Sequence, residues 1–221
     1  MTSFISRRTL LKRALGASVA VPIVGRLERS LSAAQAPAVQ AMPAAPESLS
    51  SHELEILNAV ASRLIPNDAN GPGAVDAGAT RYIDRALAGP LSSSRQAYTH
   101  GLAALDQYAE SSRGKPFREL SPTDQDSVLI DVETGAASGF TGGSAPFFAM
   151  LVGHTHQGMF GDPYYGGNKD FAGWDLVRYP GVRTMVTVAD QHGLETGQLK
   201  PNHRSAYDYG TFTKADPQHG D

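Results

Sequence analysis

Apolar residues recur at helical spacing over much of the chain that follows residue 48, with polar residues at the positions between them. Near the start, Leu57, Ala61 and Leu64 fall on one face of a helix, with Leu54 one turn earlier. Similar stripes follow, and Pro and Gly clusters separate them. The pattern predicts a mainly α fold of about five helices joined by long loops. The expected helices span approximately residues 50–65, 78–88, 93–110, 121–134 and 144–157.

Two of these helices begin with recognisable capping sequences. Ser50 followed by Glu53 fits a capping box, in which each side chain bonds to the other residue's backbone N–H. Ser121 followed by Pro122 places a capping hydroxyl before a proline at the first helical position, and Asp124 adds an acidic residue to the first turn. We therefore expect the folded domain to start near residue 49.

Residues 158–181 depart from the helical pattern. This stretch holds six aromatic residues, including Trp174, which is the only tryptophan, and six of the 23 glycines. The glycines are too frequent for a helix interior, and Pro163 and Pro180 interrupt any strand. So many aromatic residues are atypical of a disordered linker. We expect an ordered loop, which either packs its own rings over the helical core or presents them to a partner protein.

The chain beyond this loop carries weaker signals. Residues 182–189 allow a short strand or one more helix, and the run Val186, Thr187, Val188 favours the strand. From Gln191 the sequence is polar. We assign residues 49–210 to the helical domain and residues 211–221 to a polar tail.

The first 36 residues have the pattern of an export signal. Arg7 and Arg8 precede a mildly apolar run over residues 14–25, which is too short to span a bilayer. The arrangement resembles a twin-arginine signal peptide, and it predicts a periplasmic protein that the twin-arginine translocase exports. An amphipathic N-terminal helix or a signal anchor is the alternative. The uncharged, Ala- and Pro-rich residues 37–48 are expected to form a linker.

Composition excludes several functions. The chain has 221 residues and a formal net charge of −3, but six of its 19 Lys and Arg residues lie within the first 36 positions. The remainder is therefore acidic and poorly suited to binding nucleic acid. There are no cysteines, which excludes disulfides, thiolate metal sites, iron–sulfur ligation and a cysteine nucleophile.

Catalytic and cofactor motifs are absent from the sequence. No Gly-x-Gly-x-x-Gly follows a strand, no Gly-x-Ser-x-Gly elbow occurs, and no Glu-x-x-His pair is present. His154 and His156 could share a metal only if the helix ended before them, since residues two apart on a helix diverge. Asp162, Asp170 and Asp175 are candidate carboxylates, but in such a loop aspartates more often accept backbone N–H bonds.

The loop sequence, from Gly158 through Trp174 to Tyr179-Pro180-Gly181, resembles the signature of the gluconate 2-dehydrogenase subunit 3 family. The resemblance extends over approximately residues 49–189, and it includes Arg63-Leu64-Ile65-Pro66 at the end of the first helix. Members of this family are small subunits of bacterial flavin-dependent sugar and sugar-acid dehydrogenases.

This resemblance implies a non-catalytic subunit that pairs with a large FAD-dependent flavoprotein of the glucose–methanol–choline oxidoreductase type. A cytochrome c subunit often accompanies the pair, and the small subunit escorts the folded flavoprotein through export. No catalytic, cofactor-binding or metal-binding residue is then expected in this chain, and FAD and haem c would belong to the partners. A stand-alone exported enzyme or a ligand-binding protein that uses the loop remains the alternative. The candidate partner contacts are Phe160, Asp162, Tyr164, Tyr165, Asn168, Phe171, Trp174 and Tyr179.

Overall fold

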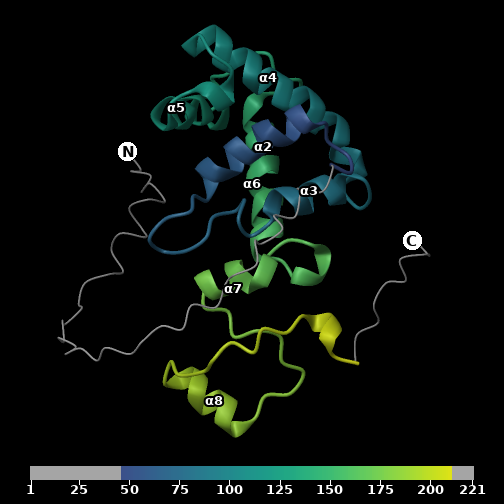
Figure 1. The fold of residues 1–221 in the computed structure, drawn as a ribbon, viewed down its shortest axis with the longest axis vertical. Coiled ribbons are helices and arrows are strands. Elements are labelled where there is room, and N and C mark those ends of the chain that lie inside the picture. The colour runs from purple at the N-terminus through teal and green to yellow at the C-terminus, as the bar shows by residue number, and fades with distance from the viewer. Residues whose placement is uncertain (1–45, 211–221) are drawn as a thin grey trace, which may run out of the picture. The chain divides into compact units, whose positions relative to one another are not determined.

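The computed structural model describes residues 46–210, which form seven α-helices and several short 3-10 turns, with no strand among these residues (Figure 1). The chain divides into two units, Met1–Met42 and Pro43–Asp221, and the described residues belong to the second. The mainly helical fold expected from the sequence is thus confirmed. The predicted signal peptide with Arg7 and Arg8, most of the linker, and the tail lie outside the described residues. The helices are α2 (Ser51–Leu64), α3 (Ala79–Leu87), α4 (Arg95–Arg113), α5 (Pro122–Glu133), α6 (Ser144–Phe160), α7 (Ala172–Leu176) and α8 (Val188–Glu195).

Both predicted capping sequences start helices where expected. Ser50 and Glu53 form the complete capping box at α2, with the Ser50 N–H donating to the Glu53 carboxylate at 2.7 Å. Ser121 caps α5 by accepting from the Asp124 N–H at 3.2 Å, and Pro122 occupies the first helical position. These bonds satisfy N–H groups that have no partner within the helix, so the sequence fixes both start points locally.

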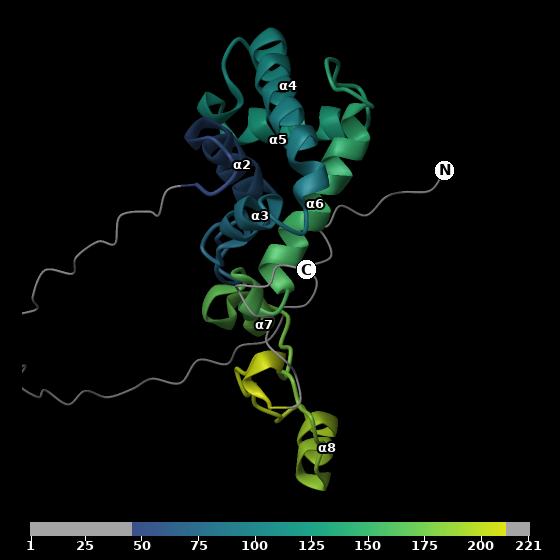
Figure 2. The same cartoon turned by 90° about the vertical axis from the view of Figure 1, so that its right-hand side faces the viewer.

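Helices α2 to α6 enclose one apolar core. Helix α6 packs mainly against α3 and α5, and α2 packs against α3, α4 and α5 (Figure 2). Gly101 in α4 leaves room for the ring of Phe147 in α6, because a Cβ at Gly101 would overlap that ring. None of the helices within residues 46–210 is long and apolar enough to cross a membrane. The largest completely buried side chains include Tyr98, Phe117, Ile56, Leu57, Ile83, Leu87, Leu102, Leu105, Leu151 and Met159.

The start of the domain is fixed by a single buried carboxylate. Asp84 in α3 is 1% exposed, and its two oxygens accept the backbone N–H groups of three consecutive residues. The distances are 2.7 Å to Glu47, 2.9 Å to Ser48 and 2.7 Å to Leu49. A carboxylate that accepts several N–H bonds is well stabilised inside a protein.

Two expectations about the C-terminal part were wrong. Helix α6 continues to Phe160, so the first three residues of the stretch 158–181 are helical rather than part of a loop. The strand favoured for residues 182–189 does not form, and α8 begins within that range. Thr187 and Asp190 form a capping box that starts α8, and this local signal outweighs the β-propensity of the valines around it.

Candidate functional site

Close contacts between backbones hold residues 161–181, which we call the aromatic loop, against the end of α6, and hold α6 against α3. Gly158 packs on Ala79 of α3, where a Cβ would lie 2.7 Å from the Ala79 Cα. Gly167 lies against the Gly158 carbonyl, and Gly173 lies against the Met159 carbonyl, each too close for a Cβ. These three glycines therefore serve close approach of chain segments, the use that only a residue without a side chain allows.

Asn168 is the central polar residue of the loop. It is completely buried and adopts a left-handed backbone conformation with φ of 46°. Its side chain donates to the Gly161 carbonyl at 2.9 Å and accepts from the Gly173 N–H at 2.8 Å. Its own N–H donates to the Gly158 carbonyl at 2.7 Å. One amide thus links the end of α6, the loop and the start of α7.

Trp174 is the buried aromatic residue of the loop. Its side chain is 6% exposed, and its indole Nε1 donates to the Phe160 carbonyl at 2.9 Å. The Phe171 ring lies 5.4 Å away between centroids, and the Tyr179 ring packs edge-on at 4.8 Å. A tryptophan with a buried ring and a satisfied N–H is an anchor of the loop itself.

The tyrosines of the loop pack against the C-terminal segment. Tyr164 stacks on Tyr207 at 3.9 Å between ring centroids, and the Tyr165 and Tyr207 hydroxyls share a hydrogen bond of 2.7 Å. That hydrogen bond, with burial and the neighbouring charges adding to it, raises the pKa of Tyr165 to about 12. Asp162 joins the same two segments, since it accepts from the N–H groups of Tyr164 and Ala206.

Asp175 and both candidate histidines also take part in local structure, whereas Asp170 is exposed. Asp175 pairs with His203 at 2.7 Å, and the His203 ring stacks on Phe171 at 5.0 Å. Helix α6 continues through both His154 and His156, so the condition for a shared metal site is not met. His154 instead shares a 3.1 Å hydrogen bond with the buried Tyr98 hydroxyl, and burial lowers the His154 pKa.

Comparison with protein families identifies the family of this chain. A family model described as gluconate 2-dehydrogenase subunit 3 matches residues 51–181, which is more than half of the chain and includes the whole aromatic loop. The chain belongs to the gluconate 2-dehydrogenase subunit 3 family. Comparison with curated proteins and with solved structures gives no significant match. Membership in this family implies a place in a multi-subunit dehydrogenase complex.

Within this family member, the eight predicted contact residues divide by exposure. Asn168 and Trp174 are buried, whereas Tyr165 is 52% and Tyr179 is 39% exposed. The remaining four are half-buried, namely Phe160, Asp162, Tyr164 and Phe171. The structure therefore brings all eight residues into one region but leaves only two of them widely accessible.

Sequence reasoning missed the contribution of the segment after residue 200. His203 and Tyr207 complete the ring contacts of the loop, and Ser205 starts the turn that carries Tyr207. The sequence of this segment indicates only that it is polar. The run Ser205-Ala-Tyr-Asp208, which forms a capping box, was the local signal that could have identified an ordered turn.

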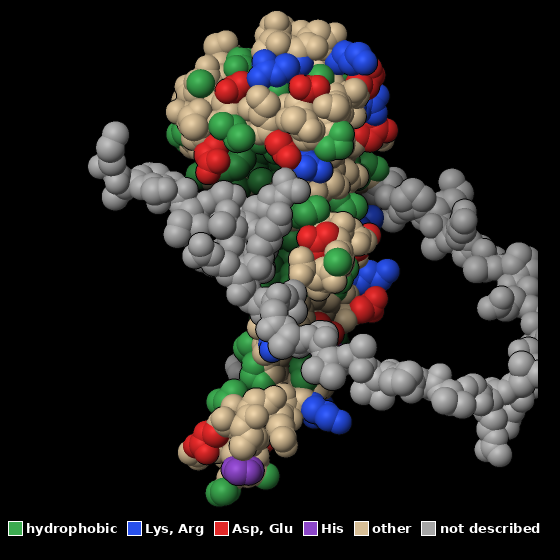
Figure 3. Space-filling view, turned by 90° about the vertical axis from the view of Figure 1, so that its left-hand side faces the viewer, with side chains coloured by type: hydrophobic (Ala, Val, Ile, Leu, Met, Phe, Trp, Pro, Cys, Tyr) green, Lys and Arg blue, Asp and Glu red, His purple; other side chains and the backbone are tan. Residues whose placement is uncertain are grey.

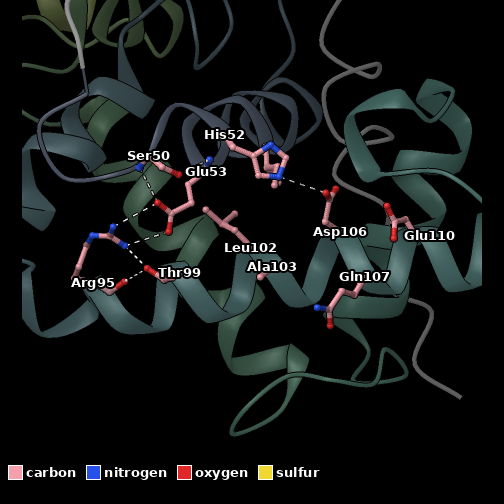
Figure 4. A pocket seen from close by; sticks show the side chains of 11 residues that line it. Ser50, His52, Glu53, Arg95, Thr99, Leu102, Ala103, Asp106, Gln107 and Glu110 are labelled. Atoms are coloured by element: carbon pink, nitrogen blue, oxygen red, sulfur yellow. Dashed lines mark hydrogen bonds and ion pairs between the residues drawn. The ribbon is translucent and has the colours of Figure 1, made fainter.

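A concave region with a volume of about 470 Å³ lies between α2 and α4 (Figure 4). Arg95 and Glu53 pair across it at 3.2 Å, and His52 lies 3.6 Å from Asp106. Burial raises the pKa of Glu53, but the hydrogen bonds from Ser50, Thr99 and Arg95 outweigh it and hold that pKa below its ordinary value. Asp106 also accepts the Phe117 N–H at 2.8 Å. These groups bond to one another and to the backbone, as residues that join two helices do.

Among residues 46–210, no three His, Asp or Glu side chains are arranged to hold a metal ion.

Proposed function

We propose that this chain is the non-catalytic small subunit of a periplasmic, membrane-associated, FAD-dependent sugar or sugar-acid dehydrogenase. In this role it binds the large flavoprotein of the glucose–methanol–choline type and escorts it through twin-arginine export. FAD then resides in the large subunit, and any haem c resides in a third subunit. Family membership supports a subunit role, and the twin arginines Arg7 and Arg8 support the export route.

One observation carries the non-catalytic part of the proposal. The Asp162 and Asp175 carboxylates, candidates for acid–base chemistry, already have structural partners. Asp162 bonds two backbone N–H groups, and Asp175 bonds His203. Asp162 therefore holds the loop and the segment around Ala206 together, which supports a structural role for this carboxylate. The same loop presents Tyr165 and Tyr179 at the surface, where aromatic rings are effective partner contacts.

The proposal is tested by purifying the tagged full-length chain from cells that produce it naturally. We expect an FAD-containing polypeptide to co-purify and the complex to oxidise a sugar or sugar acid with an artificial electron acceptor. The small subunit, separated from its partner, should be inactive. Turnover by the separated chain would instead identify a stand-alone enzyme.

The export part has its own test. Replacing both arginines, Arg7→Lys with Arg8→Lys, keeps the charge but removes the paired guanidinium groups of the motif. We expect the double variant and its flavoprotein partner to remain in the cytoplasm, as followed by cell fractionation. A matched pair of changes further along, Arg26→Lys with Arg29→Lys, should leave export intact. Periplasmic delivery of the Arg7/Arg8 variant would refute the twin-arginine route.

A further inference from the structure

Residues 182–200, which we call the hook, expose apolar side chains instead of burying them. Met185 is 77% exposed, Val186 68%, Val188 85% and Leu194 63%. These are the four most exposed large apolar residues among residues 46–210, and they occur within ten positions of one another. No residue of α8 is buried. Exposed apolar side chains gathered in one short segment are typical of interaction sites.

The hook is nevertheless ordered, because hydrogen bonds hold its two ends in place. Asn202 donates to the Val182 carbonyl at 2.6 Å, and the Tyr209 hydroxyl donates to the same oxygen at 2.7 Å. Arg183 donates to the Lys200 carbonyl at 2.9 Å, which joins the two ends of the hook. These hydrogen bonds therefore order the segment without burying its apolar side chains.

Within the hook, polar bonds also set the position of α8. The capping box of Thr187 and Asp190 starts the helix, with the Asp190 N–H donating to the Thr187 hydroxyl at 3.1 Å. The chain after the helix folds back on it, since the Leu199 N–H donates to the Gly193 carbonyl at 2.9 Å. A segment ordered before binding loses little conformational entropy on docking.

The hook continues from the exposed edge of the aromatic loop. Val177, 56% exposed, and Tyr179, 39% exposed, lie just before residue 182 in the chain. Both views place α8 beyond α7, away from α4 and α5 (Figures 1 and 2). Figure 3 shows hydrophobic side chains at the surface in this part of the molecule. Helix α8 is not among the helices that pack together in the core.

We infer that the hook is the docking element through which this chain binds the large dehydrogenase subunit. Met185, Val186, Val188 and Leu194 would enter an apolar groove of that subunit. The inference rests on the proposed function, because family membership is what supplies a partner subunit. It adds a location that lies beyond residue 181, where the family match ends.

Charge argues against a membrane surface as the binding partner of the hook. A membrane surface attracts basic residues around an apolar face, whereas the hook carries two acidic residues, Asp190 and Glu195, beside its two basic ones, Arg183 and Lys200. Two copies of the chain could instead pack their exposed apolar side chains against each other in an isologous dimer. Family membership favours the large subunit over that dimer, because it implies a place in a multi-subunit dehydrogenase complex.

Photo-crosslinking of the full-length chain tests the contact directly. A benzophenone amino acid is placed at position 188 in the hook and, as the control, at position 130 in α5, where Ile130 is 56% exposed. The tagged chains are irradiated in cells that also produce the flavoprotein. We expect a crosslink from position 188 to the FAD-containing polypeptide, identified by mass spectrometry, and none from position 130. A crosslink from position 188 to a second copy, or within the same chain, would overturn the inference.

Charged substitutions measure what the contact contributes. Val188→Asp with Leu194→Asp should reduce the flavin recovered per small subunit at least tenfold, whereas Ile130→Asp should leave it unchanged. The melting temperature of both variants should match that of the wild-type chain, because all three side chains are exposed. Undiminished recovery by the hook variant, with wild-type recovery intact, would refute the docking role alone. Failure of the wild-type chain to recover any flavoprotein would refute the proposed function as well.

Discussion

The helical core and the part of the chain after Phe160 are stabilised in different ways. Helices α2 to α6 bury complete apolar side chains, with Leu57, Leu105 and Phe117 all at 0% exposure. Between residues 161 and 210, only Gly167, Asn168, Gly173, Trp174, Gly181 and Ser205 are buried. There the order comes from side chains that bond to the backbone and from stacked rings.

This difference shows how one chain can combine a stable fold with an exposed apolar surface. Apolar burial stabilises a core but uses up the same side chains that a partner would need. A segment ordered by hydrogen bonds and glycine contacts keeps its apolar side chains accessible. The C-terminal part of this protein follows the second plan, most clearly in the hook.

The largest expected effect concerns Trp174, which belongs to the loop but is buried like a core residue. Trp174→Ala should lower the free energy of unfolding by about 3–5 kcal/mol, the range expected also for Phe117→Ala in the core. Trp174→Phe keeps much of the ring volume and loses the indole bond to Phe160, so it should cost less. Urea unfolding followed by circular dichroism measures all three. Unchanged global stability in Trp174→Ala would mean that the loop folds separately from the core.

The next effect concerns Asn168, the polar counterpart of a core residue. Asn168→Ala leaves the Gly161 carbonyl and the Gly173 N–H without their buried partner, which should cost about 2–4 kcal/mol. Asn168→Gly removes the same bonds but relieves the left-handed backbone, so it should be more stable than the alanine variant by about 1–2 kcal/mol. Equal stability of the two variants would show that backbone strain contributes nothing here.

A smaller effect is expected where the loop meets the C-terminal segment. Tyr207→Phe removes the hydroxyl bond to Tyr165 and should cost about 1 kcal/mol in the free energy of unfolding. The pKa of Tyr165, about 12 in the folded protein, should then fall towards the ordinary value of 10.0. Ultraviolet titration of the phenol groups measures that change, and an unaltered titration would contradict the assigned bond.

The pH dependence of stability follows from the same pair. Because folding raises the Tyr165 pKa, the neutral phenol stabilises the folded state below pH 10.0, and this contribution is lost as the pH rises towards about 12. The alkaline loss of stability should therefore be smaller in Tyr207→Phe than in the wild-type chain. Thermal melts between those pH values provide the comparison.

The smallest effect is expected in the hook. Leu194→Ser should change the free energy of unfolding by less than about 0.5 kcal/mol, because the side chain is 63% exposed. Leu105→Ala in the core should cost about 2–5 kcal/mol. If Leu194→Ser were as damaging as the core change, the side chain would be buried in solution and unavailable for docking.

The sequence predicted the core well because its signals are local. The capping pairs at Ser50 and Ser121 and the apolar stripes each refer to residues a few positions apart, and the helices start as expected. Trp174 is buried and its indole N–H donates to the Phe160 carbonyl, and the sequence alone does not indicate that contact.

The C-terminal part was harder to predict because its contacts join distant residues. Asp162 bonds to Ala206, and Tyr164 stacks on Tyr207, and nothing in either sequence segment indicates the other. The error at residues 182–189 has a different cause. Valines favour strands only where a neighbouring strand is available, and none exists within residues 46–210. The exposed valines of the hook therefore follow no core pattern.

The buried carboxylate of Asp84 ties the first residues of the domain to α3. Glu47, Ser48 and Leu49 each give one N–H to it, so a protease that trims the chain past Glu47 would progressively empty a buried acceptor site. Trimming up to residue 46 leaves all three bonds in place. Asp84 therefore makes Glu47 the first residue whose backbone the folded domain uses in this contact.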